Sequence, residues 1–170
     1  MIQFISDSAH YSIVLDQLQH VKRTLWIGTA DIKDLYIETN GEKKPFLALL
    51  AELIKRGVEV RLIHAKEPGP AFREDFDKYP LLSQSLERAL CPRVHFKLVI
   101  IDCEKAYIGS ANLTGAGMGM KGENTRNFEA GVFTDVPELV EAAINKFDDV
   151  WMGKMCKKCK RRAFCGDPIV

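Results

Sequence analysis

The segments Thr24-Leu-Trp-Ile-Gly-Thr-Ala30 and Val58-Glu-Val-Arg-Leu-Ile-His-Ala65 decide the fold class. Both are short apolar runs with several β-branched residues, a composition that predicts strands. Between them, Phe46 to Arg56 has the apolar rhythm of a helix, and Gly57 follows as a residue that ends helices. A strand, a helix and a strand with short joints form a βαβ unit. The sequence therefore predicts an α/β fold with a parallel sheet between helices.

The remaining elements extend this pattern in both directions. An amphipathic helix is expected from about residue 8 to 22, and another around Leu81 to Leu90 in an otherwise polar surface excursion. Pro137 opens a last helix, which runs to about Trp151. Further strands are expected over Val94 to Asp102, Ala106 to Gly109 and Asn127 to Thr134.

The size of the chain suits one domain with a buried core, since it has 170 residues, of which 46% are hydrophobic. We expect this domain over residues 1–152, followed by a basic, cysteine-rich tail over 153–170. With 24 Lys and Arg against 23 Asp and Glu, the chain is not a strongly basic nucleic-acid coat, so an anionic partner must meet a local patch. The chain shows no secretory signal and no membrane-spanning apolar run, which predicts a cytoplasmic location.

The most informative segment is His95-Phe-Lys97-Leu-Val-Ile-Ile-Asp102, followed by Gly109-Ser110-Ala-Asn112. Side chains two apart on a strand share a face, so His95 and Lys97 project together. Ser110 and Asn112 repeat that spacing after a glycine, with donors suited to a phosphate. Asp102 follows His95 by an odd step, which favours a structural role. Taken alone, His-x-Lys is more often part of an ordinary buried strand with a snorkelling lysine.

The complete pattern is more specific, and it resembles the phospholipase D superfamily. It comprises His95, Lys97, Asp102, Gly109, Ser110 and Asn112. The resemblance implies a mixed, mainly parallel sheet flanked by helices on both faces. It also implies that Glu129, in Asn127-Phe128-Glu129, orients the catalytic histidine.

The resemblance further implies a phosphodiesterase that needs no metal or other cofactor for catalysis. One histidine attacks phosphorus and a second protonates the leaving oxygen, while lysine and amide donors stabilise the charge. The other histidines of this chain (His10, His20 and His64) do not begin the complete pattern; His20 and His64 have a lysine two residues on, but none of the three has the aspartate that follows it in the pattern. The two catalytic histidines are therefore expected from two copies in a symmetric homodimer.

The tail holds three cysteines, Cys156, Cys159 and Cys165, and Cys91 is a candidate fourth ligand from beside the motif strand. Four thiolates suit zinc and an iron–sulfur cluster equally well, so both metals stay open. The alternative is that these are unligated tail thiols. Cys103 is left over as a buried or adjacent thiol.

Basic residues of the tail form a candidate contact surface for nucleic acid. A charge run is most often a solvated face, but here it lies beside possible metal ligands, which favours phosphate contact. Lys121, in the glycine-rich stretch that holds Met118 and Met120, is a further candidate, although such a stretch is as often a plain loop. The tail candidates are Lys157, Lys158, Lys160, Arg161 and Arg162.

Three functional hypotheses follow from these features. The leading one is a nuclease that cleaves DNA or RNA through a phosphohistidine. The second is a lipid phosphodiesterase, for which an apolar access surface would be expected. The third is a nucleic-acid-binding module whose site is inactive.

Overall fold

A computed structural model describes residues 1–33, 35–39 and 41–169. Within these ranges the chain forms a seven-stranded sheet in the order β1-β11-β9-β8-β2-β6-β7. The strands of this sheet are β1 (Ile2–Ser6), β2 (Thr24–Thr29), β6 (Glu59–His64), β7 (Glu87–Leu90), β8 (Lys97–Ile101), β9 (Lys105–Gly109) and β11 (Ala130–Thr134). Two small pairs lie beside it, formed by β3 (Ile32–Lys33) with β10 (Leu113–Thr114) and by β4 (Tyr36–Thr39) with β5 (Glu42–Pro45).

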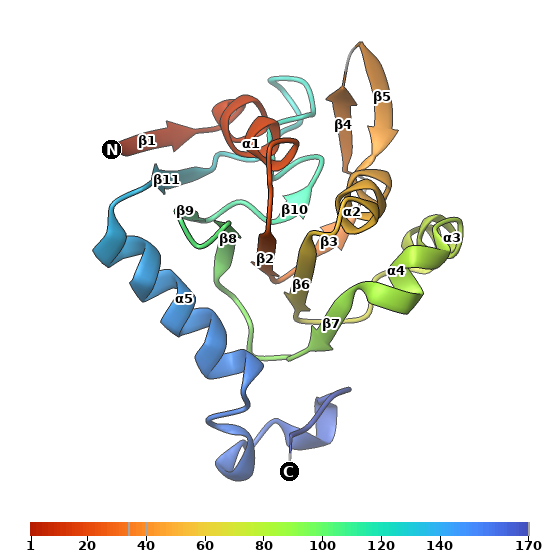
Figure 1. Cartoon of the computed structure of the whole chain (residues 1–170), viewed down its shortest axis with the longest axis vertical. Coiled ribbons are helices and arrows are strands. Elements are labelled where there is room, and N and C mark those ends of the chain that lie inside the picture. Colours follow the sequence, from red (N-terminus) through yellow and green to blue (C-terminus); the bar gives the residue numbers. More distant parts are fainter. Residues whose placement is uncertain (34, 40, 170) are drawn as a thin grey trace.

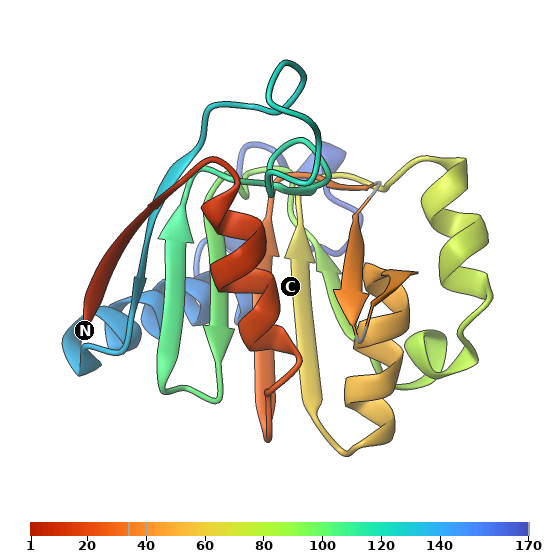
Figure 2. The ribbon, with the colours of Figure 1, turned by 90° about the horizontal axis from the view of Figure 1, so that it is seen from above.

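Helices cover both faces of the sheet, as Figure 2 shows for α1 and α5. One face carries the helical turns η1 (His10–Leu15) and α1 (Asp16–Leu18), and α2 (Phe46–Lys55) packs on the same core. The other face is covered by α5 (Pro137–Trp151), whose Val140, Ala143 and Phe147 pack against β8. Of the shorter helices, α4 (Pro80–Ser85) packs against α2, and α3 (Pro70–Asp77) packs against α4. The tail holds the single turns η2 (Cys156–Lys158) and η3 (Arg162–Phe164).

The mixed α/β sheet between helices is confirmed, but its mainly parallel character is wrong. Within the seven-stranded sheet of the described residues, β2 with β6 and β6 with β7 are parallel, and the other four pairs run antiparallel. The reason lies in the connections, because β8 and β9 are joined by the tight turn Asp102–Glu104, which reverses the chain. The βαβ unit is thus one half of the sheet and a meander is the other.

Some element predictions also need correction. The helix expected at Leu81–Leu90 ends at Ser85, and residues 87–90 form the edge strand β7 because their backbone pairs with β6. The strand expected from Val94 is regular only from Lys97. The helix expected over residues 8–22 spans His10 to Leu18. No element was predicted at α3 or β1, nor at the short strands β3, β4, β5 and β10.

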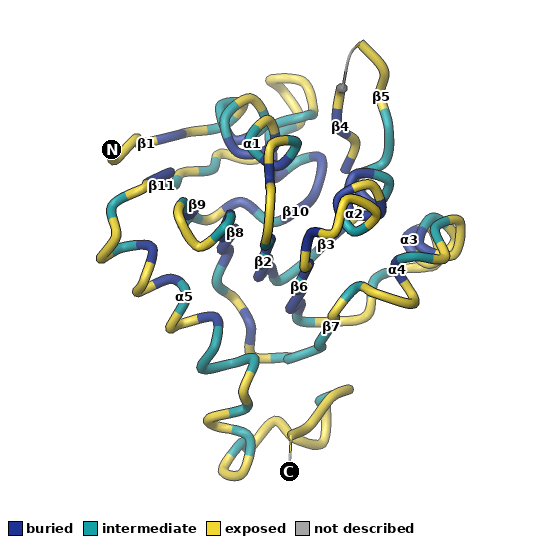
Figure 3. Tube along the Cα trace, in the orientation of Figure 1, coloured by how far each residue is buried: buried dark blue, intermediate teal, exposed yellow. Residues whose placement is uncertain are grey.

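The core lies along the central strands, and burial falls toward the C-terminus. Figure 3 shows buried residues along the middle of the sheet and an exposed or half-buried tail below it. No helix among the described residues is both long enough and apolar enough to cross a bilayer.

Candidate active site

His95 and Lys97 lie where the chain enters β8. His95 is exposed just before the strand, whereas Lys97 is its first residue and is only 7% exposed. The Lys97 amine donates a hydrogen bond to the His95 carbonyl oxygen at 2.7 Å and lies 3.3 Å from His95 Nδ1. Burial lowers the pKa of Lys97, and the negative charge of Glu129 opposes that effect. A cation is therefore held against the imidazole.

Phe96 fixes the backbone between these two residues. Its ring lies over Gly28 of β2 so closely that a Cβ there would be 2.2 Å from a ring carbon. Because a side chain at position 28 would displace the ring, the glycine is needed for this approach. The position of His95 thus depends on a contact with the neighbouring strand.

The register of the sheet brings Ser110 and Glu129 to the same edge. Lys97 pairs with Gly109 across β8 and β9, and Gly109 pairs with Gly131 of β11. The Ser110 hydroxyl donates to the Glu129 carboxylate and accepts from the Ala130 amide at 3.0 Å. The sheet therefore gathers residues from three strand ends.

Glu129 is held on several sides. Its Oε1 accepts from Asn127 Nδ2 at 3.0 Å, and its backbone N–H donates to Asp7 Oδ1 at 3.0 Å. In the described part of the chain its carboxylate bonds to Ser110 and Asn127, and no hydrogen bond joins it to His95. Glu129 therefore orders the serine turn and adds negative charge near Lys97.

Tyr107 lies beneath this edge, and sequence reasoning missed it. A Cβ at Gly109 would be 2.3 Å from the Tyr107 hydroxyl oxygen, and one at Gly131 would be 2.5 Å from its ring. The hydroxyl accepts from the Ala111 amide at 3.1 Å, while burial raises the pKa of Tyr107 to about 12. The sequence signal that could have revealed Tyr107 is the pair Gly109 and Gly131, because two glycines on neighbouring strands leave room for one large ring.

Asn112 directs its side-chain oxygen toward the end of β2. Its Oδ1 accepts from the amides of Ala30 and Asp31 at 3.2 and 3.3 Å, and from the Thr29 hydroxyl at 3.3 Å. The oxygen thus supports backbone, and the amide NH₂ is the part that can donate to a phosphate oxygen.

Asp102 lies at the opposite end of β8 from His95. Its carboxylate accepts from the backbone amides of Lys22, Arg23 and Thr24 at 3.1, 2.6 and 3.0 Å. Burial alone would raise its pKa, but these three hydrogen bonds outweigh it and lower the pKa. Asp102 therefore secures the turn after β8 and takes no place beside the imidazole.

A groove of about 580 Å³ lies beside His95. Its walls come from the loop between β7 and β8, the C-terminal end of α5, and the tail, which meet at the bottom of Figure 1. Cys91, Cys156 and Cys159 share this lining with His95. The Cys165 thiol lies outside it, donating to the Leu90 carbonyl oxygen at 3.6 Å. Within residues 1–33, 35–39 and 41–169, no three His, Cys, Asp or Glu side chains are grouped as a metal site, so the four-cysteine site stays a prediction.

The predicted phosphate-contacting cations do not form one patch. The loop that carries Lys121 lies at the top of Figure 1, and the tail with its five cations lies at the bottom. All six side chains are exposed. Met118, from the same loop as Lys121, is buried in the core, so it cannot meet a substrate.

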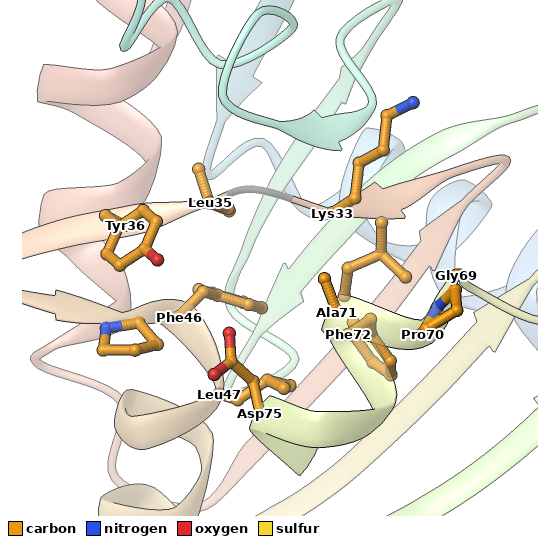
Figure 4. A pocket seen from close by; sticks show the side chains of 12 residues that line it. Lys33, Leu35, Tyr36, Phe46, Leu47, Gly69, Pro70, Ala71, Phe72 and Asp75 are labelled. Atoms are coloured by element: carbon orange, nitrogen blue, oxygen red, sulfur yellow. The ribbon is translucent and has the colours of Figure 1, made fainter.

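A second cavity, of about 220 Å³, lies away from these residues. It is bounded mainly by apolar side chains near β3, β4, α2 and α3, such as Phe46 and Phe72 (Figure 4). None of the predicted site residues lines it.

The fold and the site geometry define a phospholipase D-like protein. Residues 14–151 match the family model described as cardiolipin synthase, PLD-like domain, and the chain belongs to this family within the phospholipase D superfamily. A comparison with curated proteins gives no match.

Solved structures share the fold at low sequence identity. Nuc, a phospholipase D family member from Salmonella typhimurium, is 21% identical with a TM-score of 0.64, over 89% of this chain and 93% of that one. TrmBL2, an archaeal chromatin protein with a novel mode of DNA binding, is 16% identical with a TM-score of 0.60, over 89% and 52%. A phosphatidylserine synthase from Haemophilus influenzae Rd KW20 is 13% identical with a TM-score of 0.65, over 87% and 36%. At these identities the likeness concerns the fold.

Proposed function

We propose that this protein hydrolyses phosphodiesters in DNA or RNA, with His95 as the nucleophile and a second copy completing the site. The observation that carries the proposal is the exposed His95 imidazole beside a groove, with the Lys97 amine 3.3 Å from its Nδ1. Membership of the phospholipase D-like family supports the reaction class.

Each nitrogen of the ring has its own part in the proposed reaction. Because Nδ1 faces the Lys97 amine, Nε2 is the nitrogen that can reach phosphorus. Nε2 has a free lone pair when the ring proton is on Nδ1 and the Lys97 ammonium has turned toward the phosphate. That lone pair forms the N–P bond while the bond from phosphorus to the leaving oxygen breaks. The Lys97 ammonium and the Asn112 NH₂ stabilise charge on the non-bridging oxygens. The leaving oxygen takes its proton from the second copy's histidine.

Water completes the reaction. It gives a proton to the second copy's histidine as its oxygen attacks phosphorus, and the N–P bond then breaks. This scheme needs two imidazoles at one phosphate, and His95 is the sole histidine of the sequence that begins the complete pattern running through Lys97 and Asp102 to Asn112. A homodimer is therefore part of the proposal.

Nucleic acid is favoured over lipid by the exposed basic tail beside the groove. Its cations can contact successive phosphates of a polymer, each with a salt-dependent gain in affinity. The described DNA binding of TrmBL2 agrees with this partner. The likeness to phosphatidylserine synthase keeps lipid head groups as the second candidate.

Labelled DNA, RNA and phospholipid vesicles, each incubated with wild-type protein and His95→Ala, test the proposal. We expect nucleic-acid cleavage that the variant loses, with an acid-labile phosphoryl group trapped on wild-type protein. Hydrolysis of the phospholipid vesicles alone would show that the protein is a lipid phosphodiesterase and not a nuclease. Binding of nucleic acid without cleavage would show that the protein is a nucleic-acid-binding module whose site is inactive. Full activity of a monomer after dilution would refute an active site shared between two copies.

A further inference from the structure

The tail is folded onto the domain without a core of its own. No side chain of residues 153–169 is buried, and Phe164 is 72% exposed. The tail is nevertheless fixed at both ends, since Gly153 turns the chain with φ +67° close to Ile169, and Asp167 accepts a hydrogen bond from the Leu90 amide at 2.7 Å. Ordering residues 153–169 costs conformational entropy for each residue, and surface contacts of this kind compensate for only part of that cost. Small segments of this kind are commonly held by a metal.

Four of the five cysteines gather where the tail meets the domain. Cys91 directly follows β7, and it lines the groove together with Cys156 and Cys159. Cys165 donates its thiol to the carbonyl oxygen of Leu90, the residue before Cys91. Cys103 lies apart from them, exposed in the turn at the far end of β8. All five thiols are free of disulfides.

We propose that Cys91, Cys156, Cys159 and Cys165 bind a zinc ion or an iron–sulfur cluster as four thiolates, and that this centre fastens the tail beside the groove. Cys156 and Cys159 flank a single helical turn, η2, a spacing at which two thiolates can reach one metal centre. Cys91 lies in the domain and the other three cysteines lie in the tail, so a metal bound by all four links the tail to the domain.

The charges around the thiols suit this centre. Arg93 Nη1 lies 3.7 Å from Cys159 Sγ, and Lys157 and Lys158 stand between Cys156 and Cys159 in the sequence. Four thiolates around Zn²⁺ leave two negative charges, which such neighbours balance. Three of these thiols line the groove and the fourth, of Cys165, lies outside it, so among the described residues they do not form a coordination group. Metal binding therefore draws the tail toward Cys91.

The centre is separate from the proposed chemistry. The hydrogen bonds that order Lys97, Ser110 and Glu129 come from the sheet edge, and none involves the tail. Loss of the metal therefore frees one wall of the groove and its cations while the catalytic edge keeps its geometry.

Metal content of anaerobically purified full-length protein tests the inference without any activity assay. We expect either stoichiometric zinc with no visible absorption, or iron and acid-labile sulfide with a visible chromophore. Either result supports the centre and identifies its metal. Protein that holds neither metal, and takes up neither zinc nor a reconstituted cluster, overturns it.

Matched variants locate the ligands. Cys91→Ser and Cys156→Ser should lose the metal and make the tail susceptible to limited proteolysis, whereas Cys103→Ser should retain both properties of wild-type protein. Cys156→Ser removes no buried side chain, so the domain should stay folded by circular dichroism. Full metal retention by Cys91→Ser would refute the cross-link between tail and domain.

Discussion

The two ends of β8 carry residues of one sequence motif in different physical states. At the entrance, His95 is exposed beside a groove and the Lys97 amine points at its ring. At the exit, three backbone amides satisfy the Asp102 carboxylate, whose pKa is lowered. The difference teaches that motif membership does not define a role: one end is equipped for reaction, and the other holds the strand in place.

The largest expected effect comes from His95→Ala at the entrance. If His95 is the nucleophile, turnover should fall by at least about 10⁴-fold. Stability should change by less than about 0.5 kcal/mol, because the side chain is exposed. Turnover and the thermal midpoint of unfolding are measured on the same preparations. A large drop in the midpoint would show that His95 at the entrance of β8 stabilises the fold as Asp102 does at the exit, which contradicts the comparison.

A smaller effect is expected from Glu129→Gln, which keeps the side-chain shape but removes its charge. The carboxylate holds the pKa of Lys97 up against burial, so its loss lowers that pKa further. If the Lys97 ammonium is needed, activity should be lost at lower pH on the basic side of the profile. The pH dependence of kcat measures this, and an unmoved basic limb would show that Lys97 does not act as a cation.

At the exit, Asp102→Ala should mainly affect stability. Loss of hydrogen bonds from three amides to a charged group is expected to lower the free energy of unfolding by about 2 kcal/mol, measured by urea denaturation. The folded pKa of Asp102 is depressed, so its contribution is present above its ordinary pKa and is lost as pH falls through the folded value.

The difference between wild-type protein and Asp102→Ala should therefore be constant near neutral pH and shrink in acid. Turnover of the folded variant should stay within a few-fold of wild type. A loss of activity like that of His95→Ala, without unfolding, would give Asp102 a chemical role.

The central half of the fold was predictable because its signals are local. Apolar runs and a glycine stop defined β2, α2 and β6, and Pro137 marked the start of α5. The directions of the strands were not predictable, because they depend on turns such as the one at Asp102 and Cys103, where both residues adopt positive φ. Likewise, β7 is a strand because β6 offers it an edge, which no local propensity encodes.

Some features of the candidate site were likewise predictable from the sequence, and others were not. The spacing of His95, Lys97, Ser110 and Asn112 was visible in the sequence, and the sheet register places the first three at one edge. The bond between Asp7 and the Glu129 amide joins residues 122 positions apart, so no spacing could reveal it. Asn112 is predicted to hold phosphate, and its oxygen in addition supports the end of β2 through pairings that form only in three dimensions.

The smallest expected effect is at the exit of β8, where Arg23 and Glu104 form an ion pair. Their side chains are 64% and 66% exposed, so water and salt screen the attraction. Glu104→Gln should change the free energy of unfolding by less than about 0.5 kcal/mol, and added salt should reduce that change further. Asp102→Ala in the same turn is the matched comparison, since its carboxylate accepts hydrogen bonds from three backbone amides. If Glu104→Gln costs as much as Asp102→Ala, charge near Arg23 rather than hydrogen bonding holds this end of the strand, and the contrast between the two ends loses its basis.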